Sequence, residues 1–253
     1  MGPSTVLKKR ARKGALPASA LVTIINDDGS WNWFQDERVI VTAGKLIVGS
    51  VADGIHDTTR AGNVEVVSYD LSTSRIARFV LHHPANDEDR KRWLNDHSAP
   101  AFTVRPDGRI VAMYSLHGLG NTLYYRISNV AGSVTSWNGE REFPPASNSK
   151  VTFPNLHFLS SENGGEGRVY AFFRGIDQRQ LPSWAYSDNL GATWAPGASF
   201  IEIPDKPKVI PYVKYCSNGS DTVHIAFTSG HHLDYGNALY HFYYRGEEFF
   251  RSD

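Results

Sequence analysis

The sequence has one cysteine, no excess of charge of either sign and no long apolar run. Because Cys216 is its only cysteine, the 253-residue chain cannot form an internal disulfide, and the redox compartment is not revealed. Lysine plus arginine and aspartate plus glutamate each total 26, so the overall charge suggests neither nucleic acid nor an anionic membrane as a partner. No stretch is long and apolar enough to span a membrane.

The first 20 residues differ in character from the rest of the chain. They carry a basic cluster from Lys8 to Lys13, and the following stretch, Ala15 to Ile25, is interrupted by Pro17 and is a poor signal-peptide core. We therefore expect a disordered basic tail over residues 1–20 and one β domain over residues 21–253. Cellular location does not follow from these residues.

Short runs rich in Val, Ile, Tyr and Phe recur between Gly, Asn, Asp and Pro turns, which is typical of strands and hairpins. Groups of such runs begin near Arg38, Ala101, Thr152 and Tyr212, a spacing of about 50 to 60 residues that suits four-stranded propeller blades. The sequence predicts an all-β fold, a β-propeller of four-stranded antiparallel blades with about four blades in this chain. The charged segment Pro84 to Trp93 interrupts the rhythm and is expected to be a short helix or an ordered loop.

The most specific local motif runs from Ser187 to Trp194 and matches the Asp-box pattern S-x-D/N-x-G-x-T-W. In such a hairpin an acidic or amide side chain bonds the turn backbone, the glycine takes a positive φ, and the tryptophan packs between neighbouring sheets. The motif is structural, so it predicts a propeller and not a particular reaction.

Four stretches together resemble the BNR repeat proteins that include the ulvan lyase type of polysaccharide lyase. They are Trp31 to Asp36, Asp96 to Pro100, Phe172 to Gly175 and Pro211 to Tyr215, and the resemblance extends from about Trp31 to Tyr244. It implies a seven-bladed propeller, which this chain is too short to close, so an incomplete ring or a different blade number is expected. It also implies a secreted or periplasmic location.

The reaction that this resemblance implies is β-elimination at a uronic acid. It needs a base, an acid and a cation that neutralises the carboxylate; histidine suits the first two roles and arginine the third. The resemblance places His97 and His117 as base and acid in either order, with Arg174 on the carboxylate and Tyr212 on the substrate side. The expected partner is an acidic, sulfated, ulvan-like polysaccharide.

Further substrate contacts are expected from the same stretches, at Trp33, Asp36, Asn155, His157 and Tyr215. One departure from the family concerns a tyrosine that works with the first histidine in some members. The segment Thr152 to Phe158 offers phenylalanines, Phe158 among them, and His157 in that region. Because phenylalanine transfers no proton, a binding protein without catalysis becomes an alternative.

A separate group of metal-binding residue types lies on the last hairpins. If the strands Thr222 to Thr228 and Ala238 to Arg245 pair, His224 and His241 come nearly opposite each other, and zinc accepts cysteine and histidine ligands. Similar lyases are associated with a structural zinc, so we expect one zinc ion bound by Cys216, His224, His231 and His241. His232 belongs to the same group of histidines. No organic cofactor is expected.

Three functions therefore compete. The leading one is a lyase for a uronic-acid-containing polysaccharide. The second is a sialidase-like glycoside hydrolase, suggested by the Asp-box, although Arg38, Arg126 and Arg174 show no spacing that supports an arginine cluster. The third is a carbohydrate-binding propeller without catalysis. A lyase alone leaves an unsaturated sugar that absorbs in the ultraviolet.

Overall fold

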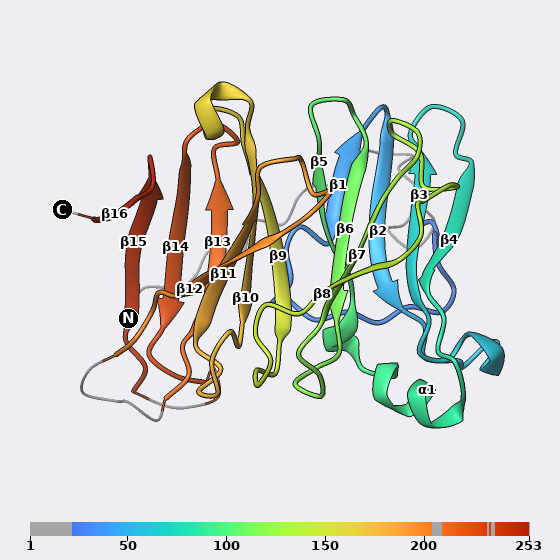
Figure 1. Cartoon of the computed structure of the whole chain (residues 1–253). Coiled ribbons are helices and arrows are strands. Elements are labelled where there is room, and N and C mark those ends of the chain that lie inside the picture. Colours follow the sequence, from blue (N-terminus) through green and yellow to red (C-terminus); the bar gives the residue numbers. More distant parts are fainter. Residues whose placement is uncertain (1–21, 204–208, 232, 234–235, 253) are drawn as a thin grey trace, which may run out of the picture.

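The computed structural model describes residues 22–203, 209–231, 233 and 236–252, so the predicted tail and His232 lie outside it. Within these residues the protein consists of four antiparallel sheets of four strands each. Figure 1 shows the sheets side by side in chain order, from the first at the right to the last at the left. The predicted all-β architecture of four four-stranded blades is confirmed.

Each sheet is a meander in which sequential strands are neighbours. The first sheet contains β1 (Val39–Thr42), β2 (Lys45–Val51), β3 (Val64–Asp70) and β4 (Ile76–His82). The second contains β5 (Ala101–Val104), β6 (Ile110–Ser115), β7 (Leu123–Ile127) and β8 (Arg141–Phe143). The third contains β9 (Thr152–Leu159), β10 (Arg168–Arg174), β11 (Pro182–Ser187) and β12 (Ala195–Ser199). The fourth contains β13 (Tyr212–Ser217), β14 (Thr222–Thr228), β15 (Leu239–Arg245) and β16 (Glu248–Arg251).

The charged segment between the first two sheets forms the helix α1 (Asp87–Trp93), as one of the two expected alternatives. Asn86 caps it by accepting a hydrogen bond from the backbone of Asp89, and acidic residues fill its first turn and basic residues its last. Trp93 is buried against the core between the first two sheets. Among the described residues no helix is long and apolar enough to cross a membrane.

Successive sheets pack face to face, because the alternation of side chains along each inner strand supplies an apolar residue to both sides. On β6, Ile110 and Tyr114 belong to the core shared with the first sheet, whereas Val111 belongs to the core shared with the third. A third core joins the last two sheets. This stacking of sheets by their faces is the packing of propeller blades.

The Asp-box forms the turn between β11 and β12, as the motif predicts. Asn189 accepts a hydrogen bond from the backbone of Thr193 at 2.8 Å, and Gly191 has φ +86°. A Cβ on Gly191 would lie 2.9 Å from the side chain of Val111 in the second sheet, so glycine also allows the close approach of the two sheets. Trp194 packs against Tyr125 of that neighbouring sheet.

The four residues with a predicted catalytic role lie at one end of the sheets. The strands β5, β9 and β13 begin there, and β6 and β10 end there, because neighbouring strands run antiparallel. The helix α1 marks this lower end in Figure 1. His97, His117, Arg174 and Tyr212 all lie at or next to these strand ends.

Candidate active site

His97 and His117 lie face to face beside the second sheet. His97 belongs to the 3₁₀ turn Asp96–Ser98 that leads into β5, and His117 follows the neighbouring strand β6. Their rings are stacked, with centroids 4.0 Å apart and an interplanar angle of 13°. The structure thus brings together the two residues expected to form the proton-transfer pair.

Asn95 lies beside both histidines and indicates which nitrogen of His117 carries the proton. Its Oδ1 accepts a hydrogen bond from the backbone N–H of His97 at 3.0 Å, which places its Nδ2 3.4 Å from Nδ1 of His117. An amide nitrogen only donates, so Nδ1 of His117 accepts. On these partners we assign the proton of the neutral His117 ring to Nε2.

The partner of His97 gives that ring the opposite arrangement. Its Nδ1 lies 2.5 Å from Oδ1 of Asp96. A carboxylate only accepts, so Nδ1 of His97 donates and Nε2 keeps its lone pair. Gln35 holds the backbone of the same residue by donating from Nε2 to the carbonyl oxygen of His97. The stacked pair therefore offers one acceptor, on His97, and one donor, on His117.

The surroundings of His117 keep it neutral. Burial, with the nearby His97 and Arg174, lowers the pKa of His117 to about 4, and Asp96 acts in the opposite direction. At neutral pH the ring therefore presents an N–H donor without a positive charge.

A phenylalanine covers the histidine pair. The ring of Phe153 lies 5.2 Å from that of His97 and 5.5 Å from that of His117. Its φ of +58° is a left-handed conformation that a residue with an aromatic side chain rarely adopts. The phenylalanine that faces the pair is therefore Phe153; Phe158 packs over Gly167 at the other end of β9.

Arg174 and Tyr212 form the second part of the site. The guanidinium carbon of Arg174 lies 4.2 Å from the ring centroid of Tyr212 and 5.1 Å from that of Phe153. The residue is only 9% exposed, and its Nη2 donates to the carbonyl oxygen of Pro211 at 3.4 Å. In the described part of the chain no carboxylate pairs with Arg174, since Asp177 pairs with Arg179. A buried cation without a counter-ion favours an anionic ligand.

The segment before β1 crosses the inner strands of the next three sheets. Phe34 packs against Phe153 and Tyr212, with ring centroids 5.2 and 4.8 Å apart. Asp36 pairs with Asn155 of β9 in a parallel bridge and forms an ion pair with Lys214 of β13. Of the predicted substrate contacts, Asp36 and Asn155 thus lie beside the site but bond within the protein.

Trp33 lies on the same segment and is 57% exposed, with its ring 5.7 Å from that of Phe34. Lys214 donates a hydrogen bond to its carbonyl oxygen. Trp33 thus places a partly exposed indole next to Phe34 at the edge of the site.

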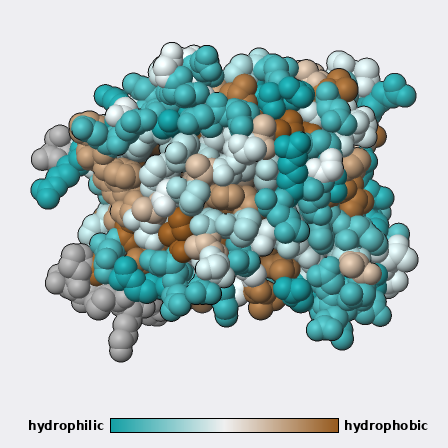
Figure 2. Space-filling view, in the orientation of Figure 1, coloured by the Kyte–Doolittle hydropathy of each residue, from teal (hydrophilic) through white to brown (hydrophobic). Residues whose placement is uncertain are grey.

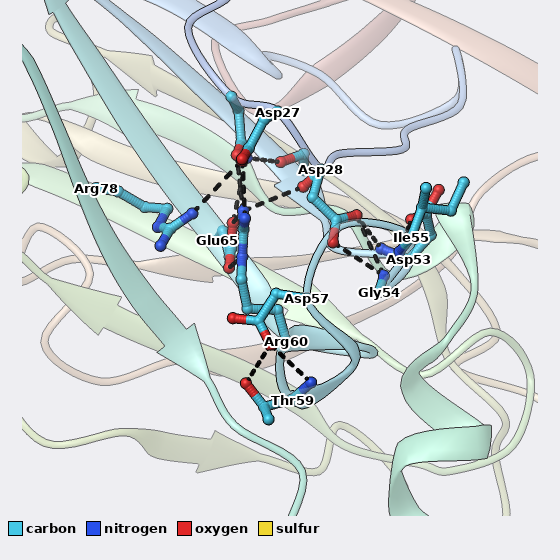
Figure 3. Close-up of polar contacts among 12 residues, drawn as sticks. Asp27, Asp28, Asp53, Gly54, Ile55, Asp57, Thr59, Arg60, Glu65 and Arg78 are labelled. Atoms are coloured by element: carbon cyan, nitrogen blue, oxygen red, sulfur yellow. Dashed lines mark hydrogen bonds and ion pairs between the residues drawn. The ribbon is translucent and has the colours of Figure 1, made fainter.

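A network of charges around the buried Arg60 anchors the start of this segment to the first sheet (Figure 3). Arg60 is 8% exposed and donates to Glu65 and to Asp27, each at 2.8 Å. Asp28 accepts hydrogen bonds from the backbone of Asp53 and Gly54. Because Phe34 and Gln35 follow only a few residues later, this network helps to place both against the site.

His157 and Tyr215 are buried away from the histidine pair. His157 is 4% exposed, its Nε2 has no partner among the described residues, and burial lowers its pKa to about 4. Tyr215 stacks on Phe172 with ring centroids 4.7 Å apart, and burial raises the pKa of its hydroxyl. Tyr215 borders the small pocket beneath Arg174 and Tyr212, whereas His157 lines a different hollow with Cys216.

The four residues expected to hold zinc do not gather. Cys216 lies opposite His224 on adjacent strands, and Nδ1 of His224 is 3.1 Å from Nε2 of His241. The residue opposite His224 on β15 is Tyr243, so the expected cross-strand pair is diagonal. His231 lies elsewhere, with its ring 5.1 Å from that of Tyr212. The described residues contain no group of three or more side chains that could hold a metal ion, so the expected zinc site is not confirmed and stays a prediction.

The arginines do not form the cluster that a sialidase-like site would need. Arg126 donates to the carbonyl oxygens of Leu81 and Asn138, and Arg38 lies over Trp31 and near Asp36. Of these three arginines, Arg174 is the one close enough to act on the pKa of His117. Phe153, Asn95 and Gln35 are site residues that the sequence analysis does not predict. For Asn95 a signal was present, because it directly precedes Asp96 and His97 in a turn sequence.

Comparisons with known proteins agree with this fold. A search of curated proteins finds no match to the sequence. Two structures of an ulvan lyase from a polysaccharide lyase family are similar, one of them bound to a GlcA-containing saccharide. Their TM-scores are 0.62 and 0.61 at 15% identity, covering 87% and 86% of this chain. The chain spans 54% of the length of each of those proteins.

The model of the BNR repeat-containing family matches residues 55–252, which is most of the sequence. The matched region includes β3 and β4 of the first sheet, the other three sheets, the Asp-box, both stacked histidines and Arg174. The chain therefore belongs to the BNR repeat-containing family.

Proposed function

We propose that this protein is a polysaccharide lyase that cleaves a uronic-acid-containing polysaccharide by β-elimination. The observation that carries the proposal is the stacked pair of histidines beside a buried arginine that has no carboxylate partner in the described chain. The similarity to a lyase bound to a GlcA-containing saccharide supports it. The expected substrate is an anionic, ulvan-like polymer.

In this mechanism Arg174 binds the uronate carboxylate. A guanidinium fork matches a carboxylate in shape, and neutralising the carboxylate makes the proton on C5 more acidic. The pocket is lined by Phe34, Phe153 and Tyr212, which exclude water and strengthen the ion pair. Trp33 stacks on a neighbouring sugar ring.

His97 is the base, because its Nε2 carries the free lone pair. It removes the C5 proton; the C5–H electrons form the C4–C5 double bond, and the bond from C4 to the glycosidic oxygen breaks. Asp96, at 2.5 Å from Nδ1, stabilises the imidazolium that results. The protonated His97 then returns its proton to the leaving oxygen, so one residue serves as base and acid.

His117 acts as a neutral hydrogen-bond donor in this scheme. Because its pKa is about 4, the His117 ring is neutral at neutral pH. It therefore does not carry the extra proton that the acid of a two-histidine relay would donate. Its Nε2–H instead stabilises the negative charge that develops on the substrate as the C5 proton leaves.

The experiment is to follow the ultraviolet absorbance of the unsaturated product during incubation with a panel of uronic-acid polysaccharides. We expect absorbance to rise with wild type, to be abolished in His97→Ala, and to fall in His117→Ala without complete loss. His56→Ala, at an exposed histidine outside the site, is the matched control.

A second candidate, a carbohydrate-binding protein without catalysis, is favoured by one observation. Phe153 occupies the place beside both histidines where a tyrosine would supply a proton-transferring hydroxyl. A flat absorbance trace together with saturable binding of the same polymers would support this candidate and refute the lyase.

A further inference from the structure

A second polar pocket lies at the end of the sheets opposite to the histidine pair. It is formed between the second and third sheets, where β5 and β7 end and β8 begins, and the Asp-box turn closes one side. This upper end is mostly hydrophilic in Figure 2. Its polar lining consists of Arg105, Arg109, Arg141, Asn129, Asn138 and Asn189, with Ser128.

The lining carries three positive charges and no acidic residue. Arg105 and Arg109 share one carboxylate oxygen of Asp107, at 2.9 and 2.8 Å. Arg141 has no ion pair in the described part of the chain, and its Nη1 donates to the carbonyl oxygen of Ala192 in the Asp-box turn. One aspartate against three arginines leaves the pocket with an excess of positive charge.

Arg105 is built into the protein and has unused hydrogen-bonding capacity. Its side chain is only 10% exposed, and its Nε is buried without a partner among the described residues. Burying a guanidinium costs free energy, and an unpaired buried donor adds to that cost. An anion with several acceptor oxygens would satisfy this donor and offset the excess charge.

We infer that this pocket binds an oxyanion, a sulfate or carboxylate group, at a site separate from the histidine pair. Guanidinium groups donate in a fork that matches the oxygens of such groups, and amide nitrogens supply further donors. The site does not depend on the proposed elimination. If the ligand is an anionic polymer, the pocket would hold a second segment of that polymer on the side of the protein opposite to the histidine pair.

The test is isothermal titration with inorganic sulfate at constant ionic strength, which keeps general screening unchanged. Arg109→Gln is the primary variant, because Arg109 is 40% exposed and its removal disturbs the fold little. We expect sulfate affinity to fall about tenfold, the factor that one charge-assisted hydrogen bond contributes. Arg92→Gln is the matched control, since Arg92 is 45% exposed and also pairs with one aspartate.

Asp107→Asn provides the opposite change. The amide keeps an oxygen to accept from the backbone of Arg109 but removes the charge that competes for both arginines. Sulfate should bind several times more tightly to this variant. Absence of saturable binding to wild type, or equal affinities for wild type and Arg109→Gln, would overturn the inference.

Sulfated oligosaccharides and their desulfated forms distinguish a polymer-borne group from a free ion. Tighter binding of the sulfated oligosaccharide, weakened by Arg109→Gln, supports a saccharide ligand, whereas binding of inorganic sulfate alone supports a free oxyanion. Because the pocket shares no residue with the histidine site, the affinity for inorganic sulfate tests it independently of the lyase proposal.

Discussion

Replacing His157 by leucine should make the protein less sensitive to acid. His157 is 4% exposed, and its pKa is lowered from 6.5 to about 4 by burial. The folded state therefore holds the ring neutral, while the unfolded chain binds a proton as the pH falls below 6.5. Stability from this residue is present above that pH and is lost progressively down to about pH 4.

The size of the effect follows from the two pKa values. Between pH 7 and pH 5, protonation of His157 in the unfolded chain should reduce the free energy of unfolding by about 2 kcal/mol. His157→Leu removes this loss and also removes the buried Nε2 that lacks a partner. His117 titrates in the same window but is present in both proteins, so it cancels in the comparison.

The assay is urea unfolding at a series of pH values, with the midpoint and slope measured for each protein. The wild-type curve should fall by about 2 kcal/mol more than that of His157→Leu over the window from pH 7 to pH 5. His56→Leu, at an exposed position, should follow the wild type. Equal losses in wild type and His157→Leu would refute the reasoning.

Three further changes test the site and its support. Phe153→Tyr should raise turnover by about 10²-fold, the low end of what one general acid or base contributes, as measured by the rate of ultraviolet absorbance; an unchanged rate would show that no proton passes at this position. Arg174→Gln should weaken binding of a uronate oligosaccharide by about tenfold or more in titration calorimetry, and unaltered affinity would remove Arg174 from the carboxylate site. Arg60→Met should lower the free energy of unfolding by about 3–5 kcal/mol, because Glu65 stays buried without its cationic partner, and the double variant with Glu65→Gln should recover part of the loss.

Much of the fold could be predicted because its signals are local. The strand pattern predicts inner and middle strands such as Thr222–Thr228, and the Asp-box predicts the β11–β12 turn. The outer strands β8, β12 and β16 were not located. β8 has three residues and β12 contains Pro196 and Gly197, so neither shows the alternation or β-branched composition of a strand. Pairing with the neighbouring strand decides their conformation.

The candidate site was predictable only in part. His97, His117, Arg174 and Tyr212 come from short stretches whose order resembles a known family, and the structure places them at one end of the sheets. Phe153 faces the histidine pair with a left-handed φ, which the alternation of side chains along a strand does not predict. The separation of His231 from His224 depends on where the loop after β14 turns, and the spacing of histidines in the sequence carries no such information.

The crossing segment from Phe34 to Asp36 makes the site dependent on a part of the chain that belongs to no sheet. Its backbone bonds, such as Leu156 N–H to the carbonyl oxygen of Asp36, number few beside those within the sheets. Segments with few such bonds open by local unfolding at lower free energy than the sheets they cross. Opening would remove Phe34 from Tyr212 and Gln35 from His97 while the blades stay folded. Ligand affinity would then be set partly by the fraction of molecules with this segment closed, and hydrogen exchange of Phe34 to Asp36 should slow when ligand binds.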